Sequence, residues 1–155
     1  MNSPLPPSGW VKLNFDGASQ GNLGQVGIGC IINNEEGKWI IKRAKHIKPT
    51  TNNLAKLEAL LEGIQLCLNT GLSKVIIEGD SHIVINTPRK RKTPNWVINS
   101  RLEEILHYLD QLQGYQLNHI FREGNSKADK LANKGADGFN LIKINKDINI
   151  NLVTS

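Results

Sequence analysis

The sequence has few cysteines and no long run of apolar residues. Its 155 residues include only Cys30 and Cys67, each inside a short apolar run. We therefore predict buried free thiols rather than a disulfide-stapled scaffold. No stretch approaches the roughly 20 apolar residues that cross a bilayer, and residues 1–10 lack the charged and apolar regions of a secretory signal. We expect an intracellular protein, nuclear or cytoplasmic, that is not secreted and has no membrane partner.

Acidic residues are outnumbered by basic ones. Fourteen Asp and Glu stand against nineteen Lys and Arg, which gives a formal net charge of +5. The excess favours a polyanionic partner, although a solvated surface carries the same charge without any function. The densest basic cluster consists of four consecutive residues: Arg89, Lys90, Arg91 and Lys92. It predicts either an exposed charged loop or a segment that contacts phosphates or directs nuclear import.

The length and the 39% hydrophobic content suit one globular domain, which we expect to be a monomer. Residues 1–10 form a proline-rich lead that is expected to be flexible, and residues 11–137 form the domain. Residues 138–155 alternate isoleucine with asparagine and lysine. They predict either an edge strand or a C-terminal tail, and we favour the tail.

The hydrophobic pattern alternates between strand and helix. Residues 10–19, 27–33 and 38–47 read as three strands of an antiparallel meander. A helix capped by Asn52 or Asn53 follows and ends at Gly71. A buried strand over 74–79, a short helix, a helix over 95–113, a strand over 116–121 and a helix over 126–136 complete the order. Trp96 and Leu106 are expected to face the core. This order predicts an α/β fold with a mixed sheet flanked by helices.

Three aspartates fall at the ends of these elements. Asp16 ends the first strand, Asp80 ends the fourth, and Asp129 lies in the first turn of the last helix. Neighbouring strand ends would place Asp16 beside Asp80, and divalent cations hold such carboxylates together. Taken singly, each aspartate is also explained as a turn residue, a helix cap or an anion near a helix N-terminus.

Four ordered motifs carry a resemblance to a known family. "FDGASQGNLG", "TTNNLAKLEAL", "EGDS" and "HIFREGNSKADKLANKGA" stand in the order and spacing of a type 1 ribonuclease H domain, and are most similar to the plant and retroelement-derived members. The resemblance covers about residues 12–136. It implies a mixed five-stranded sheet in which strands 1–3 are antiparallel and strands 4 and 5 are parallel.

The resemblance also implies a reaction and its residues. The family cuts the RNA strand of an RNA/DNA hybrid with four carboxylates that hold two Mg²⁺ (or Mn²⁺) ions roughly 3.5–4 Å apart. Asp16, Asp80 and Asp129 match three of these metal ligands, and His119 matches a histidine that assists proton transfer or product release.

Further matched positions are those that contact nucleic acid. Hydrogen-bonding groups in the minor groove distinguish a hybrid from DNA by its 2′-hydroxyls. The matched positions are Gly17, Asn22, Thr51, Asn52 and Asn53, and the basic run 89–92 is added as a phosphate contact.

One position departs from the family pattern. The family's catalytic glutamate comes three residues after "TNN", and here that residue is Lys56. Glu58 and Glu62 lie about 200° and 240° further around the helix, so neither is expected to substitute. Lys56 is expected to pair with Asp16 and Asp80 and to repel the metal ions.

Three hypotheses follow from this departure. The first is a hybrid-binding domain whose hydrolysis is lost or strongly impaired. The second is an active, metal-dependent hybrid endoribonuclease that tolerates Lys56. The third is a protein-interaction module on the same fold. We favour the first.

Overall fold

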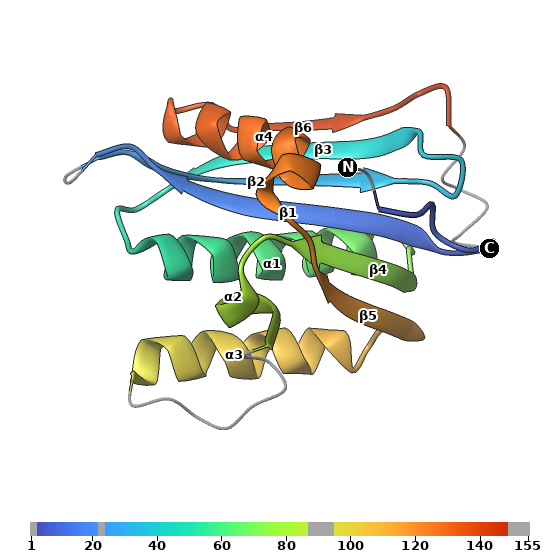
Figure 1. Ribbon diagram of the computed structural model, residues 1–155, viewed down its shortest axis with the longest axis horizontal. Coiled ribbons are helices and arrows are strands. Elements are labelled where there is room, and N and C mark those ends of the chain that lie inside the picture. Colours follow the sequence, from blue (N-terminus) through green and yellow to red (C-terminus); the bar gives the residue numbers. More distant parts are fainter. Residues whose placement is uncertain (1–2, 22–23, 87–94, 149–155) are drawn as a thin grey trace.

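The protein, represented by a computed structural model, is described over residues 3–21, 24–86 and 95–148. Strands β1 (Val11–Ser19), β2 (Val26–Asn33) and β3 (Trp39–Ile47) form the predicted antiparallel meander. Strand β4 (Lys74–Gly79) pairs parallel to β1, and β5 (Gly114–His119) pairs parallel to β4. The prediction of an α/β fold with a mixed, helix-flanked sheet is confirmed (Figure 1).

The sheet has six strands, so the prediction of five strands with a C-terminal tail is wrong at residues 141–144. Strand β6 (Leu141–Ile144) pairs antiparallel with β3, and the strand order is β5-β4-β1-β2-β3-β6. Without β6, the outer edge of β3 would present unpaired backbone groups. Leu141 also packs against a small cluster that contains Ala44. This contact selects the register, because side chains alternate between the two faces of a strand.

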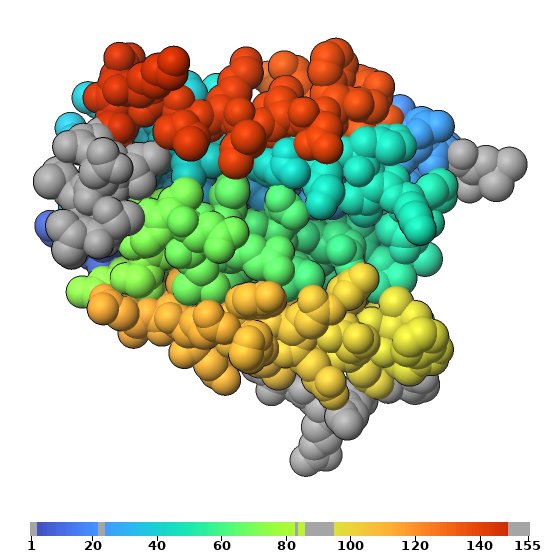
Figure 2. All heavy atoms as spheres, turned by 180° about the vertical axis from the view of Figure 1, so that it is seen from behind, coloured from blue at the N-terminus to red at the C-terminus, as the bar shows by residue number. Residues whose placement is uncertain are grey.

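Helices cover both faces of the sheet. Helix α1 (Asn52–Asn69) packs on one face, and α3 (Trp96–Leu109) packs on α1, as the reverse view in Figure 2 shows. Helix α4 (Ser126–Ala136) covers the other face over β2. A short helix α2 (His82–Asn86) follows β4, and a 3₁₀ turn η2 (Arg122–Asn125) precedes α4. In the part of the chain that the structure describes, no helix has the length and apolarity that a bilayer crossing requires.

The cap of α1 differs from the prediction. Thr51, not Asn52 or Asn53, is the cap residue, and its hydroxyl accepts a hydrogen bond from the Leu54 amide at 3.2 Å. A threonine has the same short oxygen-bearing side chain as the predicted asparagines, so the pattern could not distinguish three adjacent candidates. The consequence is that Asn52 and Asn53 keep their amides exposed in the first turn.

Helix α3 buries a narrower stripe than predicted. Leu102, Ile105 and Leu109 are buried, whereas Trp96 is 77% exposed and Leu106 is 38% exposed. At 100° per residue Leu102, Ile105 and Leu109 fall within about 60° of one another, and Leu106 falls about 40° beyond Leu102. Trp96 lies at the helix start, and Leu106 lies on its flank. The helix also ends at Leu109 rather than at residue 113.

Two glycines let α4 approach the sheet closely. A Cβ atom on Gly27 would lie 2.0 Å from the Ala136 nitrogen, and one on Gly29 would lie 2.3 Å from the Ala132 nitrogen. The helix backbone therefore rests directly on β2, and larger residues would push α4 away. On the other face, Cys30 and Cys67 are buried free thiols as predicted. Burial raises the pKa of both thiols, that of Cys67 to about 12, so both stay protonated at neutral pH.

Candidate active site at the ends of β1 and β4

Asp16 and Asp80 lie at the ends of adjacent parallel strands, as the sequence predicts. The ladder between β1 and β4 stops at the pair Asn14–Glu78, so the edge of β1 beyond it is not covered by β4. Asp16 lies on this uncovered part of β1, and Asp80 follows the last residue of β4. The different strand lengths thus create an opening where groups from other elements can enter.

Lys56 enters this opening from α1 and bridges the two aspartates. Its ammonium Nζ lies 2.8 Å from Asp80 Oδ1 and 3.4 Å from Asp16 Oδ1. The Lys56 side chain is 17% exposed, and each carboxylate is 5% exposed. Gly17 makes the approach possible, because a Cβ there would lie 2.7 Å from the Lys56 amide nitrogen. The first turns of α1 therefore rest against β1 beside Asp16.

The charges of this cluster depend on one another. Burial raises the pKa of Asp16 to about 6, against the opposing effect of the Lys56 ammonium, and the charge of Asp80 raises it further. Burial alone would lower the pKa of Lys56, but its hydrogen bond to Asp80 and the charges of both aspartates raise it above its ordinary value. At neutral pH Asp16 is therefore mostly ionised beside a protonated Lys56.

Asp129 stands apart from this bridged pair. It lies on α4, and its Oδ1 accepts a hydrogen bond from the Asn133 amide on the next turn at 3.3 Å. Its charge is close enough to raise the pKa of Asp16, although it is the last of the contributions. The described residues contain no group of three or more acidic, histidine or cysteine side chains arranged to hold a metal ion.

These residues do not fit a pair of divalent cations as they stand. A metal ion between Asp16 and Asp80 would have to lie where the ammonium of Lys56 lies. Two unit charges about 4 Å apart repel by about 4 kcal/mol at an effective dielectric constant near 20, and a divalent ion would be repelled more strongly. The site has the ligand type that Mg²⁺ prefers, but its central position is taken by a fixed cation.

The other acids of α1 point elsewhere, as the helical angles predict. Glu58 pairs with Arg101 on α3. Glu62 pairs with Arg43 at 2.9 Å and with Lys45 at 3.7 Å, both on β3. Both glutamates are therefore committed to ion pairs between elements, away from the bridged aspartates.

His119 ends β5 next to the site. It pairs with Gly79, the residue before Asp80, and its ring stacks on His82 with centroids 3.5 Å apart. Phe121 contacts the same ring edge-on at 5.9 Å. Within the described residues, no hydrogen bond or ion pair joins His119 to the three aspartates. The histidine is held beside the cluster by ring contacts, and His82 is a neighbour that the sequence motifs did not indicate.

The predicted nucleic-acid contacts are only partly within the described chain. Thr51, Asn52 and Asn53 are exposed at the start of α1, on the same helix as Lys56. Gly17 is buried against α1 and offers backbone only. Asn22 and the basic run 89–92 lie outside the described residues.

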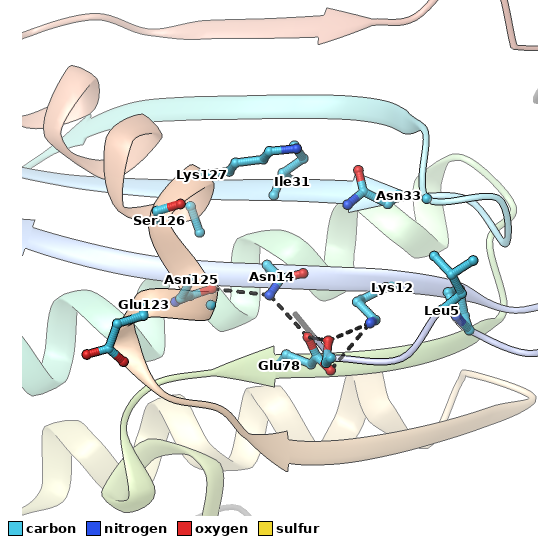
Figure 3. A pocket seen from close by; sticks show the side chains of 15 residues that line it. Leu5, Lys12, Asn14, Ile31, Asn33, Glu78, Glu123, Asn125, Ser126 and Lys127 are labelled. Atoms are coloured by element: carbon cyan, nitrogen blue, oxygen red, sulfur yellow. Dashed lines mark hydrogen bonds and ion pairs between the residues drawn. The ribbon is translucent and has the colours of Figure 1, made fainter. Parts of the chain in front are cut away.

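A buried polar chain leads from the site along the α4 face of the sheet (Figure 3). Asn125 donates one hydrogen bond to the Phe15 carbonyl at 3.0 Å and another to Asp80 Oδ2 at 3.5 Å. Asn14 donates to Asn125 Oδ1 at 3.2 Å and to Glu78 Oε1 at 3.3 Å. Mutual hydrogen bonds allow such polar side chains to be buried without a large penalty. The chain fixes the turn before α4 against the end of β4, which positions Asp80.

The far end of this chain involves the N-terminal lead. Glu78 pairs with Lys12 at 3.7 Å and accepts a hydrogen bond from the Ser3 hydroxyl at 2.8 Å. Lys12 also donates to the Ser3 hydroxyl at 2.6 Å and to the Pro4 carbonyl. Neither Glu78 nor Asn125 was expected from the sequence. Their positions in the sequence could have indicated them, because Glu78 lies two residues before Asp80 and Asn125 lies four residues before Asp129, both inside the recognised motifs.

Comparison with known proteins identifies a family model and several relatives that match this chain. A family model described as "Reverse transcriptase-like" matches residues 14–135. A ribonuclease H of Clostridium botulinum is 30% identical over 152 residues, which cover 84% of this chain and 98% of that protein. Ribonuclease HI of Halobacterium salinarum is 30% identical over 137 residues, covering 83% of this chain and 65% of the relative.

Solved structures share this fold over most of the chain. The crystal structure of RNase H1 from Halobacterium salinarum has a TM-score of 0.79 at 26% identity and covers 84% of this chain and 99% of its own. LC11-RNase H1 in complex with an RNA/DNA hybrid has a TM-score of 0.73 at 28% identity, covering 82% of this chain and 96% of its own.

Proposed function

The chain belongs to the ribonuclease H family, and from that premise we propose that it binds RNA/DNA hybrids while Lys56 suppresses cleavage of the RNA strand. One observation carries the proposal. The Lys56 ammonium lies within 3.4 Å of both Asp16 and Asp80, and it pairs with the carboxylates that a catalytic metal would use.

Hybrid binding is supported by the first turn of α1 and by the relatives. Thr51, Asn52 and Asn53 are exposed immediately before the helix turn that carries Lys56. Hydroxyl and amide groups of this kind recognise 2′-hydroxyls and sugar edges in a minor groove. A similar solved structure, LC11-RNase H1, is a complex with an RNA/DNA hybrid.

The impaired hydrolysis is supported by the charges. In the family, Mg²⁺ or Mn²⁺ supplies the charge that stabilises the reacting phosphate oxygens. Here the Lys56 ammonium already pairs with both Asp16 and Asp80, and it brings no exchangeable water or hydroxide. Lys56 thus keeps two buried carboxylates together and stabilises the fold, but it takes the position that the reaction requires.

Lys56→Glu tests the proposal directly. We expect this variant to cleave the RNA strand of a hybrid in Mg²⁺ at least about a hundredfold faster than the unaltered chain. Lys56→Gln removes the charge without adding a ligand and should gain much less. Lys48→Glu, which makes the same charge change at an exposed lysine before α1, should gain nothing.

A second readout does not depend on activity. Mg²⁺ should raise the melting temperature of Lys56→Glu more than that of the unaltered chain, because only a folded metal site gains free energy from binding. If the unaltered chain cleaves a hybrid as fast as Lys56→Glu, the active-nuclease alternative is correct instead. If neither protein binds a hybrid in a gel-shift titration, the interaction-module alternative replaces the proposal.

A further inference from the structure

A groove rich in lysine lies on the other flank of α4, between that helix and strands β3 and β6. Its volume is about 670 Å³. Six lysines and a single aspartate, Asp147, line it. The lysines are Lys127, Lys130 and Lys134 from α4, and Lys38, Lys42 and Lys143 from the sheet side. We refer to these six residues and Trp39 as the lysine groove.

Helix α4 directs its lysines away from the bridged group of Asp16, Asp80 and Lys56, which we call the aspartate cluster. Lys127, Lys130 and Lys134 fall within about 60° of one another around α4, whereas Asp129 lies about 100° or more from each of them. The two charged faces of α4 are separated by the buried stripe that contains Ala128 and Ala132 on one side and by open helix surface on the other. The groove is therefore a separate surface from the site of Asp16 and Asp80.

A β-bulge brings Trp39 to the same face as Lys42. The register between β2 and β3 shifts at Ile32 and Asn33, so that Asn33 pairs with Trp39 and Ile32 with Ile41. In a regular strand, residues three apart point to opposite faces. Here the Lys42 ammonium lies 4.6 Å from the centre of the Trp39 ring. The ring holds this ammonium by a cation–π contact at the wall of the groove.

The lysines of the groove repel one another, and few carboxylates are paired with them to offset this repulsion. Lys42 and Lys143 are directly paired across β3 and β6, an arrangement that destabilises a sheet when the charges are alike. Lys38 pairs with Glu36 at 3.9 Å. Among the described residues, no ion pair joins the other five lysines to a carboxylate. This surface thus retains unneutralised positive charge that an anionic partner would neutralise.

From this we infer that the lysine groove binds the phosphate backbone of single-stranded nucleic acid, beyond the hybrid-binding site proposed above. Lysines line both walls of the groove, and each ammonium is a point charge that can pair with a phosphate. The volume of about 670 Å³ falls in the range of small-ligand pockets and is enough for one or two nucleotides of a single strand. Trp39 supplies an aromatic ring of the kind that single-strand-binding surfaces use.

The test is binding of a fluorescein-labelled oligothymidine strand over a series of salt concentrations. Lys130→Gln combined with Lys134→Gln should weaken binding about tenfold and reduce the salt dependence by about one contact or more. The matched control is Lys48→Gln with Lys74→Gln, which removes two exposed lysines outside the groove. The control should stay within about twofold of the unaltered chain. Circular dichroism verifies that both variants are folded.

Two further measurements locate the strand and identify its chemistry. Binding should change the tryptophan fluorescence of the unaltered chain, and Trp39→Phe should abolish most of this change while Trp96→Phe should not. Equal losses in the groove and control variants, or no binding of the strand by the unaltered chain, would overturn the inference. Competition by polyglutamate as strong as that by oligothymidine would also overturn it, in favour of an acidic protein partner. None of these outcomes bears on Lys56, because the probe is not a hybrid.

Discussion

The aspartate cluster lies at the ends of β1 and β4, the lysine groove lies beside α4, and the charges of the two regions are arranged in opposite ways. In the cluster, a half-buried ammonium bridges two buried carboxylates, and a chain of hydrogen bonds holds Asp80 in place. In the groove, exposed lysines face one another with one aspartate among them. Charges that are paired internally stabilise the fold, whereas charges left unpaired at the surface are available to a partner.

Removal of the Lys56 bridge is expected to have the largest effect on stability. Lys56→Ala leaves Asp16 and Asp80 buried without a counter-ion, so we expect the free energy of unfolding at neutral pH to fall by about 4 kcal/mol. Urea denaturation measures this loss. Lys134→Ala in the groove provides the contrast, with an expected change within about 0.5 kcal/mol. Similar values for the two variants would mean that Lys56 does not stabilise the cluster.

Titration of Asp16 gives the next largest effect. Its pKa rises from 3.8 to about 6 on folding, so the folded protein binds this proton more tightly than the unfolded chain. The protonated Asp16 therefore contributes its full share to the free energy of unfolding below about pH 4. This contribution decreases as the pH rises to about 6, by up to about 3 kcal/mol. Burial is the main cause of this raised pKa; the charge of Lys56 on α1 lowers it, and the charges of Asp80 after β4 and Asp129 on α4 raise it.

The measurement compares the unaltered chain with Asp16→Asn between pH 4 and pH 6. The stability of the variant relative to the unaltered chain should increase across this interval, because asparagine does not become charged. A constant difference would show that Asp16 titrates near its ordinary pKa, and that Lys56 balances the burial of its charge.

The smallest expected effect on stability comes from a charge change in the lysine groove. Lys143→Glu replaces a like-charge pair opposite Lys42 with an attractive one and should stabilise the protein by about 0.5 kcal/mol. The same change should weaken binding of the oligothymidine strand. Lys146→Glu, an exposed lysine that does not line the groove, is the control for the charge change. A loss of stability in Lys143→Glu would show that the Lys42–Lys143 repulsion is already screened by solvent.

The sequence predicted those parts of the fold that depend on long periodic segments. Strands β1 to β5 and helices α1, α3 and α4 follow from apolar residues at strand and helix spacing. Strand β6 was missed because only Leu141 of its four residues faces buried neighbours. The exposure of Trp96 was missed because helical spacing identifies a face but not how far along the helix its partner extends.

The site was predicted to a similar extent. The pairing of Lys56 with Asp16 and Asp80 and the orientation of Glu58 and Glu62 follow from strand ends and helical angles. The hydrogen bonds of Asn125 and Glu78 were not foreseen, because they join residues 45 to 111 positions apart through the α4 face of the sheet. Whether Lys56 prevents hydrolysis, and whether His119 takes part, stay predictions.

By itself, the sequence determined which charges the protein carries: Lys56, the three aspartates of the motifs, and an excess of basic residues along the chain. Only the tertiary structure decided which of them are neutralised. The lysines of the groove range from residue 38 to residue 143. They are brought together by a bulge in β3, by one face of α4, and by the pairing of the C-terminal strand β6 with β3. Electrostatic energy depends on distance and burial in space, and the order of residues along the chain fixes neither of these for groups so far apart.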